Sequence, residues 1–87
     1  MPDLDVRLER IFLELMPRET VSPRERTRLN CVSWDSLMQL NLLVAIEQEF
    51  AIRITDDEAL DLNAYTVARQ LVEEKLAAGP LGHAERV

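Results

Sequence analysis

The chain has 87 residues, of which 47% are apolar, and its formal net charge is −6. This length allows one small domain with a single core, and the apolar content separates the chain from disordered acidic segments. The acidic balance argues against nucleic-acid binding, which needs a basic surface. Residues 35–61 hold seven acidic side chains against Arg53 alone, so the partners of this segment are expected to present basic surfaces.

The sequence also bears on the compartment. No apolar run approaches the length of a membrane span, and Met1-Pro2-Asp3 lacks the basic region of a signal peptide. Cys31 is the single cysteine, so it has no partner for an internal disulfide, which fits a reducing environment. We therefore expect a cytoplasmic protein without a membrane segment.

A first amphipathic helix is predicted near the N-terminus. Its apolar residues recur with the period of one helical face, at Leu4, Leu8, Ile11, Phe12 and Leu15. Asp3 is placed to cap this helix, and Pro17 predicts that it ends near Met16.

A long polar connection, residues 18–33, follows the first helix. Within it Ser22, Pro23 and Glu25 have the spacing of a capping box with proline at the first helical position, which predicts one short turn. A loop of this length in a small domain is usually functional or wrapped on the core. Cys31 is expected to be a small loop or core residue and not a reactive thiol.

A second, longer helix is predicted to begin at Ser36, with Asp35 as its cap, and it carries two apolar stripes. The first stripe consists of Leu42, Ile46 and Phe50, with Leu43 beside them. The second stripe consists of Leu37, Leu40 and Val44. The first stripe suits a bundle core, whereas the second indicates either a helix buried nearly all round or an exposed docking surface. From the residues alone, the buried helix is the favoured alternative for the second stripe.

The remaining elements are shorter. Ile52 and Ile54 suggest a brief extended stretch, and Thr55 to Glu58 form a capping box that opens a short helix through about Leu60. Either Asn63 or Thr66 is placed to cap a last helix. The expected inward residues of this helix are Val67, Leu71, Val72 and Leu76.

Gly79-Pro80 is expected to end the last helix, so residues 1–78 are predicted to form the domain and residues 79–87 a loose tail. The predicted fold is all-α, a small four-helix bundle with three main helices, one short helix and a long first loop.

Ser36 is the most informative candidate for chemistry. A helix N-terminus favours an anionic group such as a phosphate, because its first N–H groups are unpaired and the helix dipole is positive there. Catalysis by Ser36 would need a base, but the single histidine is His83, in the predicted tail, and the single lysine is Lys75. The sequence has no Cys/His cluster with metal-ligand spacing and no glycine-rich phosphate loop. We therefore predict a non-catalytic protein without a metal site.

The order of motifs resembles that of acyl carrier and peptidyl carrier proteins. The residues that carry the resemblance are Trp34-Asp35-Ser36-Leu37, Ile46-Glu47-Gln48-Glu49-Phe50 and the pair Ile52 and Ile54. The resemblance covers residues 4–77. It implies that Ser36 is the attachment point of a 4′-phosphopantetheine arm from coenzyme A, whose thiol holds an acyl or aminoacyl group as a thioester. It also implies that Asp35 helps the transferase to position coenzyme A.

The resemblance implies partners and a docking surface as well. The expected partners are a phosphopantetheinyl transferase, a loading enzyme (a ligase or an adenylating enzyme), and a ketosynthase or another acyl-transfer enzyme. The predicted partner-binding residues are Trp34, Leu37, Leu40, Asn41, Val44, Glu47 and Gln48. The resemblance implies docking for Leu40 and Val44 and leaves Leu37 divided between docking and the core. Trp34 is interpreted either as an anchor for the loop end or as a contact for partners or the arm. A monomer is expected.

The chain departs from the pattern of fatty-acid carriers, which have Gly-x-Asp-Ser-Leu and a glutamate five residues after the serine. Here Ser33 stands in the glycine position and Asn41 replaces the glutamate. We therefore predict a free-standing carrier of a natural-product pathway, polyketide-like or nonribosomal in type. The alternatives are an acyl carrier protein of fatty acid synthesis and an unmodified helical adaptor that binds a partner through its second helix.

Overall fold

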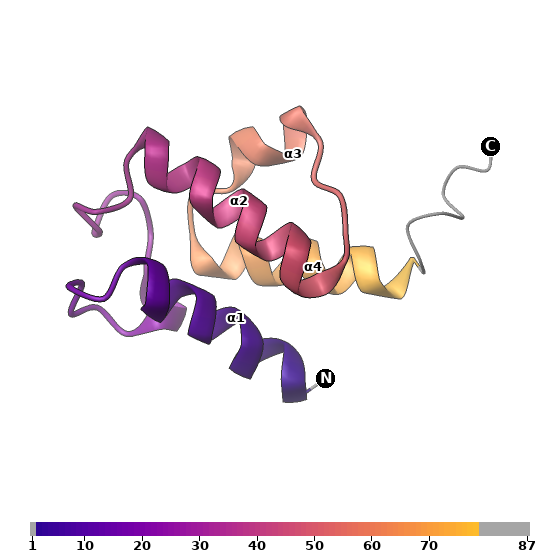
Figure 1. Ribbon diagram of the computed structural model, residues 1–87, viewed down its shortest axis with the longest axis horizontal. Coiled ribbons are helices and arrows are strands. Elements are labelled where there is room, and N and C mark those ends of the chain that lie inside the picture. The colour runs from indigo at the N-terminus through magenta and orange to yellow at the C-terminus, as the bar shows by residue number, and fades with distance from the viewer. Residues whose placement is uncertain (1, 79–87) are drawn as a thin grey trace.

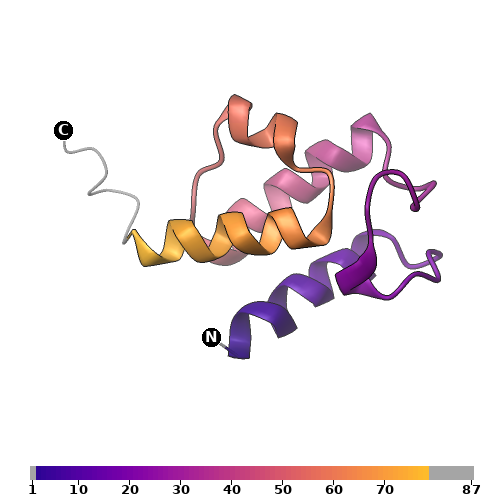
Figure 2. The ribbon, with the colours of Figure 1, turned by 180° about the vertical axis from the view of Figure 1, so that it is seen from behind.

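The computed structural model describes residues 2–78 and consists there of four α-helices and one 3-10 turn, as predicted (Figure 1). The elements are α1 (Pro2–Leu15), η1 (Pro23–Glu25), α2 (Ser36–Phe50), α3 (Asp56–Asp61) and α4 (Tyr65–Ala77). Three long helices pack side by side, and the short α3 bridges α2 and α4 on one side of the bundle (Figures 1 and 2). The predicted tail and the predicted helix end at Gly79-Pro80 lie outside the described residues.

The predicted inner faces form the core. The first stripe of α2 packs with the apolar face of α1, and its three members are buried. The core consists of Leu4, Leu8, Ile11, Phe12, Met16, Cys31, Trp34, Leu42, Ile46, Phe50, Ile52, Leu62, Tyr65, Ala68 and Val72. Phe12 lies at its centre, with its ring edge-on to Trp34 at 5.5 Å and to Tyr65 at 5.2 Å between ring centroids. In α4, Tyr65 and Ala68 are more deeply buried than the predicted Val67 and Leu71, which are half-buried.

Three predicted helix starts differ from the structure. Asp3 lies inside the first turn of α1 and is not its cap, because the helix already begins at Pro2, whose fixed φ suits the first helical position. Ser22 makes no capping hydrogen bond, although η1 forms where it was predicted. Neither Asn63 nor Thr66 caps α4, whose N-cap is Ala64.

Backbone pairing with the long loop explains the start of α4. The N–H of Tyr65 donates to the carbonyl of Arg26 at 2.9 Å, and the N–H of Arg28 donates to the carbonyl of Asn63 at 3.0 Å. Thr27 and Ala64 form an isolated antiparallel bridge between these two bonds. The first N–H of α4 is thus paired with the backbone of the long loop, which sets where this helix begins.

The long loop is held by a buried arginine. The side chain of Arg26 is only 2% exposed and its guanidinium donates to four backbone carbonyls. The acceptors are Phe12 at 2.8 Å, Met16 at 3.3 Å, Glu19 at 3.1 Å and Val21 at 2.8 Å. The carbonyls of Phe12 and Met16 belong to the end of α1, where a positive charge is also favoured by the helix dipole. Arg26 therefore fixes the loop to the C-terminus of α1.

We predict that Arg26→Ala lowers the free energy of unfolding by about 2–4 kcal/mol, because buried carbonyls lose their donors. Urea denaturation of the variant and the wild type measures the difference. Arg18→Ala is the matched control, since Arg18 is exposed in the same loop and its loss should cost less than about 0.5 kcal/mol. Equal stability of the two variants would contradict the role assigned to Arg26.

Candidate functional site

Asp35 begins α2 as predicted. Its backbone is extended (φ −98°, ψ −169°), and its Oδ1 accepts the N–H of Met38 at 2.9 Å. Its carbonyl accepts the N–H of Gln39 at 2.9 Å, the first hydrogen bond of the helix. The side chain of an N-cap aspartate thus satisfies one of the free donors of the first turn.

Ser36 is the first residue of α2, and its side chain is exposed. Within residues 2–78 its hydroxyl makes no hydrogen bond, and the N–H groups of Ser36 and Leu37 have no acceptor. The helix dipole of α2 places partial positive charge at these N–H groups. An anionic group joined to Ser36 would therefore meet free donors and a favourable potential.

Trp34 lies in the core, with 3% of its surface exposed. This burial agrees with the predicted anchor and corrects the predicted contact with partners or the arm, because the ring is enclosed against Phe12. Its indole N–H donates to Oε1 of Gln39 at 2.7 Å. Trp34 therefore fixes the loop end that leads into Ser36.

Gln39 joins the start of α2 to α3, a role that sequence reasoning missed. While its Oε1 accepts the indole N–H, its Nε2 donates to the carbonyls of Ala59 at 2.9 Å and Leu62 at 3.1 Å. These carbonyls lie at the end of α3, and that of Ala59 also accepts the N–H of Leu62 at 3.1 Å. A glutamine one turn into a helix has no sequence signature for such a bridge, because its partners come from a distant segment.

The other end of the long loop is tied to its beginning. The backbone N–H of Ser33 donates to Oε2 of Glu19 at 2.7 Å, and this hydrogen bond lowers the pKa of Glu19. Cys31 is buried between these two points, as expected, and burial raises the pKa of its thiol. Cys31 is therefore a core residue with a protonated thiol at neutral pH.

The second stripe of α2 is exposed. The exposed fractions are 67% for Leu37, 59% for Leu40 and 50% for Val44. A helix buried on all sides is therefore the wrong alternative for these three residues. Leu60 of α3, 82% exposed, lines the same cleft as Leu40 and extends the apolar surface beyond α2. We call Leu37, Leu40, Val44 and Leu60 the apolar strip.

The polar residues predicted beside the strip differ in their availability. Asn41 and Gln48 are exposed. Glu47 is half-buried, and its Oε2 accepts the N–H of Ile54 at 2.7 Å, so part of this carboxylate holds the segment after α2. The carbonyl of Glu47 also accepts the N–H of Ile52 at 3.2 Å. Glu47 therefore has a structural role in addition to any contact with a partner.

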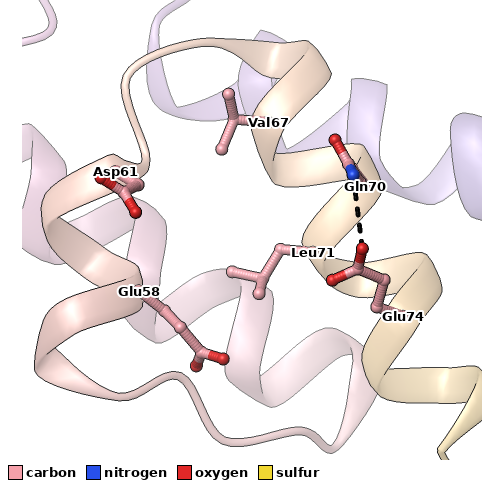
Figure 3. Close-up of a pocket in the computed structure, with 6 residues that line it drawn as sticks. All are labelled: Glu58, Asp61, Val67, Gln70, Leu71 and Glu74. Atoms are coloured by element: carbon pink, nitrogen blue, oxygen red, sulfur yellow. Dashed lines mark hydrogen bonds between the residues drawn. The ribbon is translucent and has the colours of Figure 1, made fainter.

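A groove of about 210 Å³ lies between α3 and α4 (Figure 3). Val67 and Leu71 form its apolar part, whereas Glu58 and Asp61 approach from α3. On α4, Nε2 of Gln70 donates to Glu74 at 3.3 Å. The groove lining contains no serine, cysteine or histidine, and therefore none of the usual side-chain nucleophiles for acyl transfer.

Residues 2–78 also bear on metal binding and on membrane insertion. Within this range, no three histidine, cysteine or acidic side chains are grouped so that they could hold a metal ion. None of the helices in the same range has the length and apolarity required to cross a membrane.

The solution NMR structure of the holo acyl carrier protein from Geobacter metallireducens is similar to this chain, with a TM-score of 0.75 and 32% sequence identity. The similarity covers 90% of this chain and 90% of that one. No protein-family model matches the sequence. Identity at this level over nearly the whole chain, together with the four-helix architecture, shows that the protein belongs to the acyl carrier protein family.

We predict that Leu40→Arg changes the free energy of unfolding by less than about 0.5 kcal/mol, because more than half of the Leu40 side chain is already in solvent. Leu42→Arg is the matched control on the same helix. Leu42 is fully buried, so this variant should be strongly destabilised or fail to fold. Thermal unfolding followed by circular dichroism distinguishes the two results, and unfolding of Leu40→Arg would place the apolar strip in the core.

Proposed function

We propose that this protein carries an acyl or aminoacyl group as a thioester on a 4′-phosphopantetheine arm attached to Ser36. The observation that carries the proposal is the state of Ser36: an exposed hydroxyl without an intramolecular partner, at the positive end of α2, in a chain of the acyl carrier protein family. The similar protein from Geobacter metallireducens is a holo acyl carrier protein.

The residues around Ser36 fit such an arm. Oγ of Ser36 would form the phosphoester, and the free N–H groups of Ser36 and Leu37 would face the phosphate charge. Bound to Ser36, the arm supplies the thiol that forms the thioester. Asp35 keeps the first turn of α2 in place and leaves its second carboxylate oxygen available to a transferase.

The same surroundings support a non-catalytic role. Among residues 2–78 no histidine is present, and the amino group of Lys75 is paired with Glu58 at 2.8 Å. Among the described residues Ser36 therefore has neither a histidine nor an unpaired lysine to remove its proton, and the carboxylate of Asp35 is engaged as the helix cap. The base must come from the enzyme that attaches the arm, and the chemistry of the cargo must come from partner enzymes.

Partner docking is assigned to the apolar strip and to the acidic charge of residues 35–61. The strip begins beside Ser36, so an enzyme seated on it would have the arm within reach. The expected partners are a phosphopantetheinyl transferase, a loading enzyme and acyl-transfer enzymes with basic surfaces around an apolar centre. We further propose a natural-product pathway, because the exposed position 41 carries asparagine where fatty-acid carriers have glutamate.

We predict that incubation with coenzyme A and a phosphopantetheinyl transferase of broad specificity adds the mass of one phosphopantetheine to the wild type and none to Ser36→Ala. Ser33→Ala is the matched control, since it removes a hydroxyl three residues away and should be modified as the wild type is. Intact-protein mass spectrometry gives the result. Modification of Ser36→Ala, or none of the folded wild type with a panel of transferases, would contradict the proposal and favour an unmodified adaptor.

We predict that a fatty-acid malonyl transferase loads the wild-type holo protein more slowly than Asn41→Glu. An exposed charge pair contributes about 0.2–1 kcal/mol, so the gain in kcat/KM should not exceed roughly fivefold. Gln48→Glu is the control, because it adds the same charge about two turns further from Ser36. A wild type that is loaded as fast as a fatty-acid carrier, with no gain from Asn41→Glu, would favour fatty acid synthesis.

A further inference from the structure

A cleft of about 400 Å³ lies between the first half of α2 and α3. Its apolar lining consists of Leu40, Leu43, Ala59 and Leu60, and its polar lining consists of Arg28, Gln39 and Asp56. Leu40 lies four residues after Ser36 and therefore on the same side of α2, one turn along. An arm that begins at Ser36 and passes Leu40 would enter this cleft.

Arg28 is a free cation at this cleft. Four other basic side chains of the described residues form ion pairs: Arg7 with Glu49, Arg24 with Glu9, Arg69 with Asp5, and Lys75 with Glu58. Arg10, Arg18 and Arg53 form none within the same residues, but they do not line this cleft. Arg28 is exposed and makes no ion pair within residues 2–78, although Asp56 lines the same cleft. Its guanidinium is thus available to a ligand.

The backbone of Arg28 is fixed while its side chain is free. Its N–H donates to the carbonyl of Asn63 at 3.0 Å. The turn that carries it is closed by Thr27 and Asn30, whose side chains each accept a backbone N–H of the other, at 2.8 and 3.1 Å. A ligand that pairs with Arg28 therefore restrains only the side chain, and replacement of this side chain leaves the turn intact.

The acidic charge around the cleft makes Arg28 a distinct binding position for an anion. Residues 35–61 carry a net charge of −6, so an anion on the arm would be repelled over most of this surface. Beside Arg28 it would instead meet a planar guanidinium that binds carboxylate or phosphate with two parallel hydrogen bonds. The cleft combines this cation with an apolar lining suited to an aliphatic chain.

We propose that Arg28, at the α2–α3 cleft, recognises an anionic group of the arm that Ser36 carries, either the phosphodiester of the arm or a terminal carboxylate on its cargo. The inference rests on the proposed function. Asp56 lines the same cleft, and its negative charge repels the anion. It therefore limits how strongly the cleft favours an anionic group over a neutral one. With a terminal carboxylate as the anion, Arg28 distinguishes anionic from neutral cargo.

The test uses the full chain loaded at Ser36 from coenzyme A, butyryl-coenzyme A and succinyl-coenzyme A. Butyryl and succinyl groups have the same number of carbons and differ by one terminal carboxylate. Proton–nitrogen NMR spectra follow the side-chain Nε–H of Arg28 and the amides of Leu40, Leu43, Ala59 and Leu60. Arg28→Gln is the test variant, Arg18→Gln the control for loss of an exposed loop arginine, and Asp56→Asn the variant of opposite effect.

If the anion is the terminal carboxylate of the cargo, the Arg28 Nε–H signal should shift with the succinyl arm and not with the butyryl arm. A phosphodiester source predicts the same shift in all three loaded forms relative to the unmodified protein. For either source, Arg28→Gln should lower the fraction of succinyl arms that occupy the cleft by roughly two- to fivefold, the effect of one exposed charge pair. Asp56→Asn should raise this fraction. Arg18→Gln should behave as the wild type.

An unchanged Arg28 signal in every loaded form would overturn the inference and leave the carrier function intact. Cleft amide shifts of the succinyl-loaded form that persist unchanged in Arg28→Gln would overturn it as well. Failure to load Ser36 at all is a separate result, visible in the mass spectrum before any NMR measurement, and it would overturn the proposed function and the inference together.

Discussion

The rest of the fold depends on the hydrogen bonds that the buried guanidinium of Arg26 donates. This group is buried without a carboxylate partner, and its charge is balanced by four backbone carbonyls from the end of α1 and the following loop. Arginine suits this task because its donors are fixed in one plane and it stays charged when buried. The carbonyl of Arg26 in turn receives the first N–H of α4. One residue therefore sets the end of one helix, the path of the long loop and the start of another helix.

The same loop delivers Ser36 to the surface in a defined place. Glu19 holds Ser33, Trp34 is packed on Phe12 and bonded to Gln39, and Asp35 caps the helix. The neighbours of Ser36 thus do the structural work, and its hydroxyl takes no part in it. A carrier needs an attachment residue that plays no part in the fold, because this residue must be modified and then contacted by several enzymes without a change in the structure. The apolar strip is likewise not part of the core. Its exposed side chains remain available to partners.

The helices and the position of Ser36 could be predicted from the sequence, because periodicity, proline and capping residues act over a few neighbours. The core faces of α1 and α2 follow from spacing, and the cap at Asp35 follows from its place before an apolar run. Arg26 and Gln39 could not be identified, since one is among six arginines in residues 6–28 and both act through carbonyls distant in the chain. The start of α4 was missed for a related reason: a backbone bridge replaces the side-chain cap that local rules expect. Trp34 had two plausible roles, and only tertiary packing decides for the core.

The central claim is that the hydroxyl of Ser36, and no other group, receives the arm. The most direct measurement is fragment-ion mass spectrometry of the tryptic peptide spanning residues 29–53, taken from protein incubated with coenzyme A and a phosphopantetheinyl transferase. This peptide contains Ser33 and Ser36 together with the thiol of Cys31, so it includes its own internal comparisons. We predict that the added mass appears on fragments containing Ser36 and is absent from those ending at Trp34. An arm located on Ser33 or Cys31, or no arm on this peptide, would contradict the account.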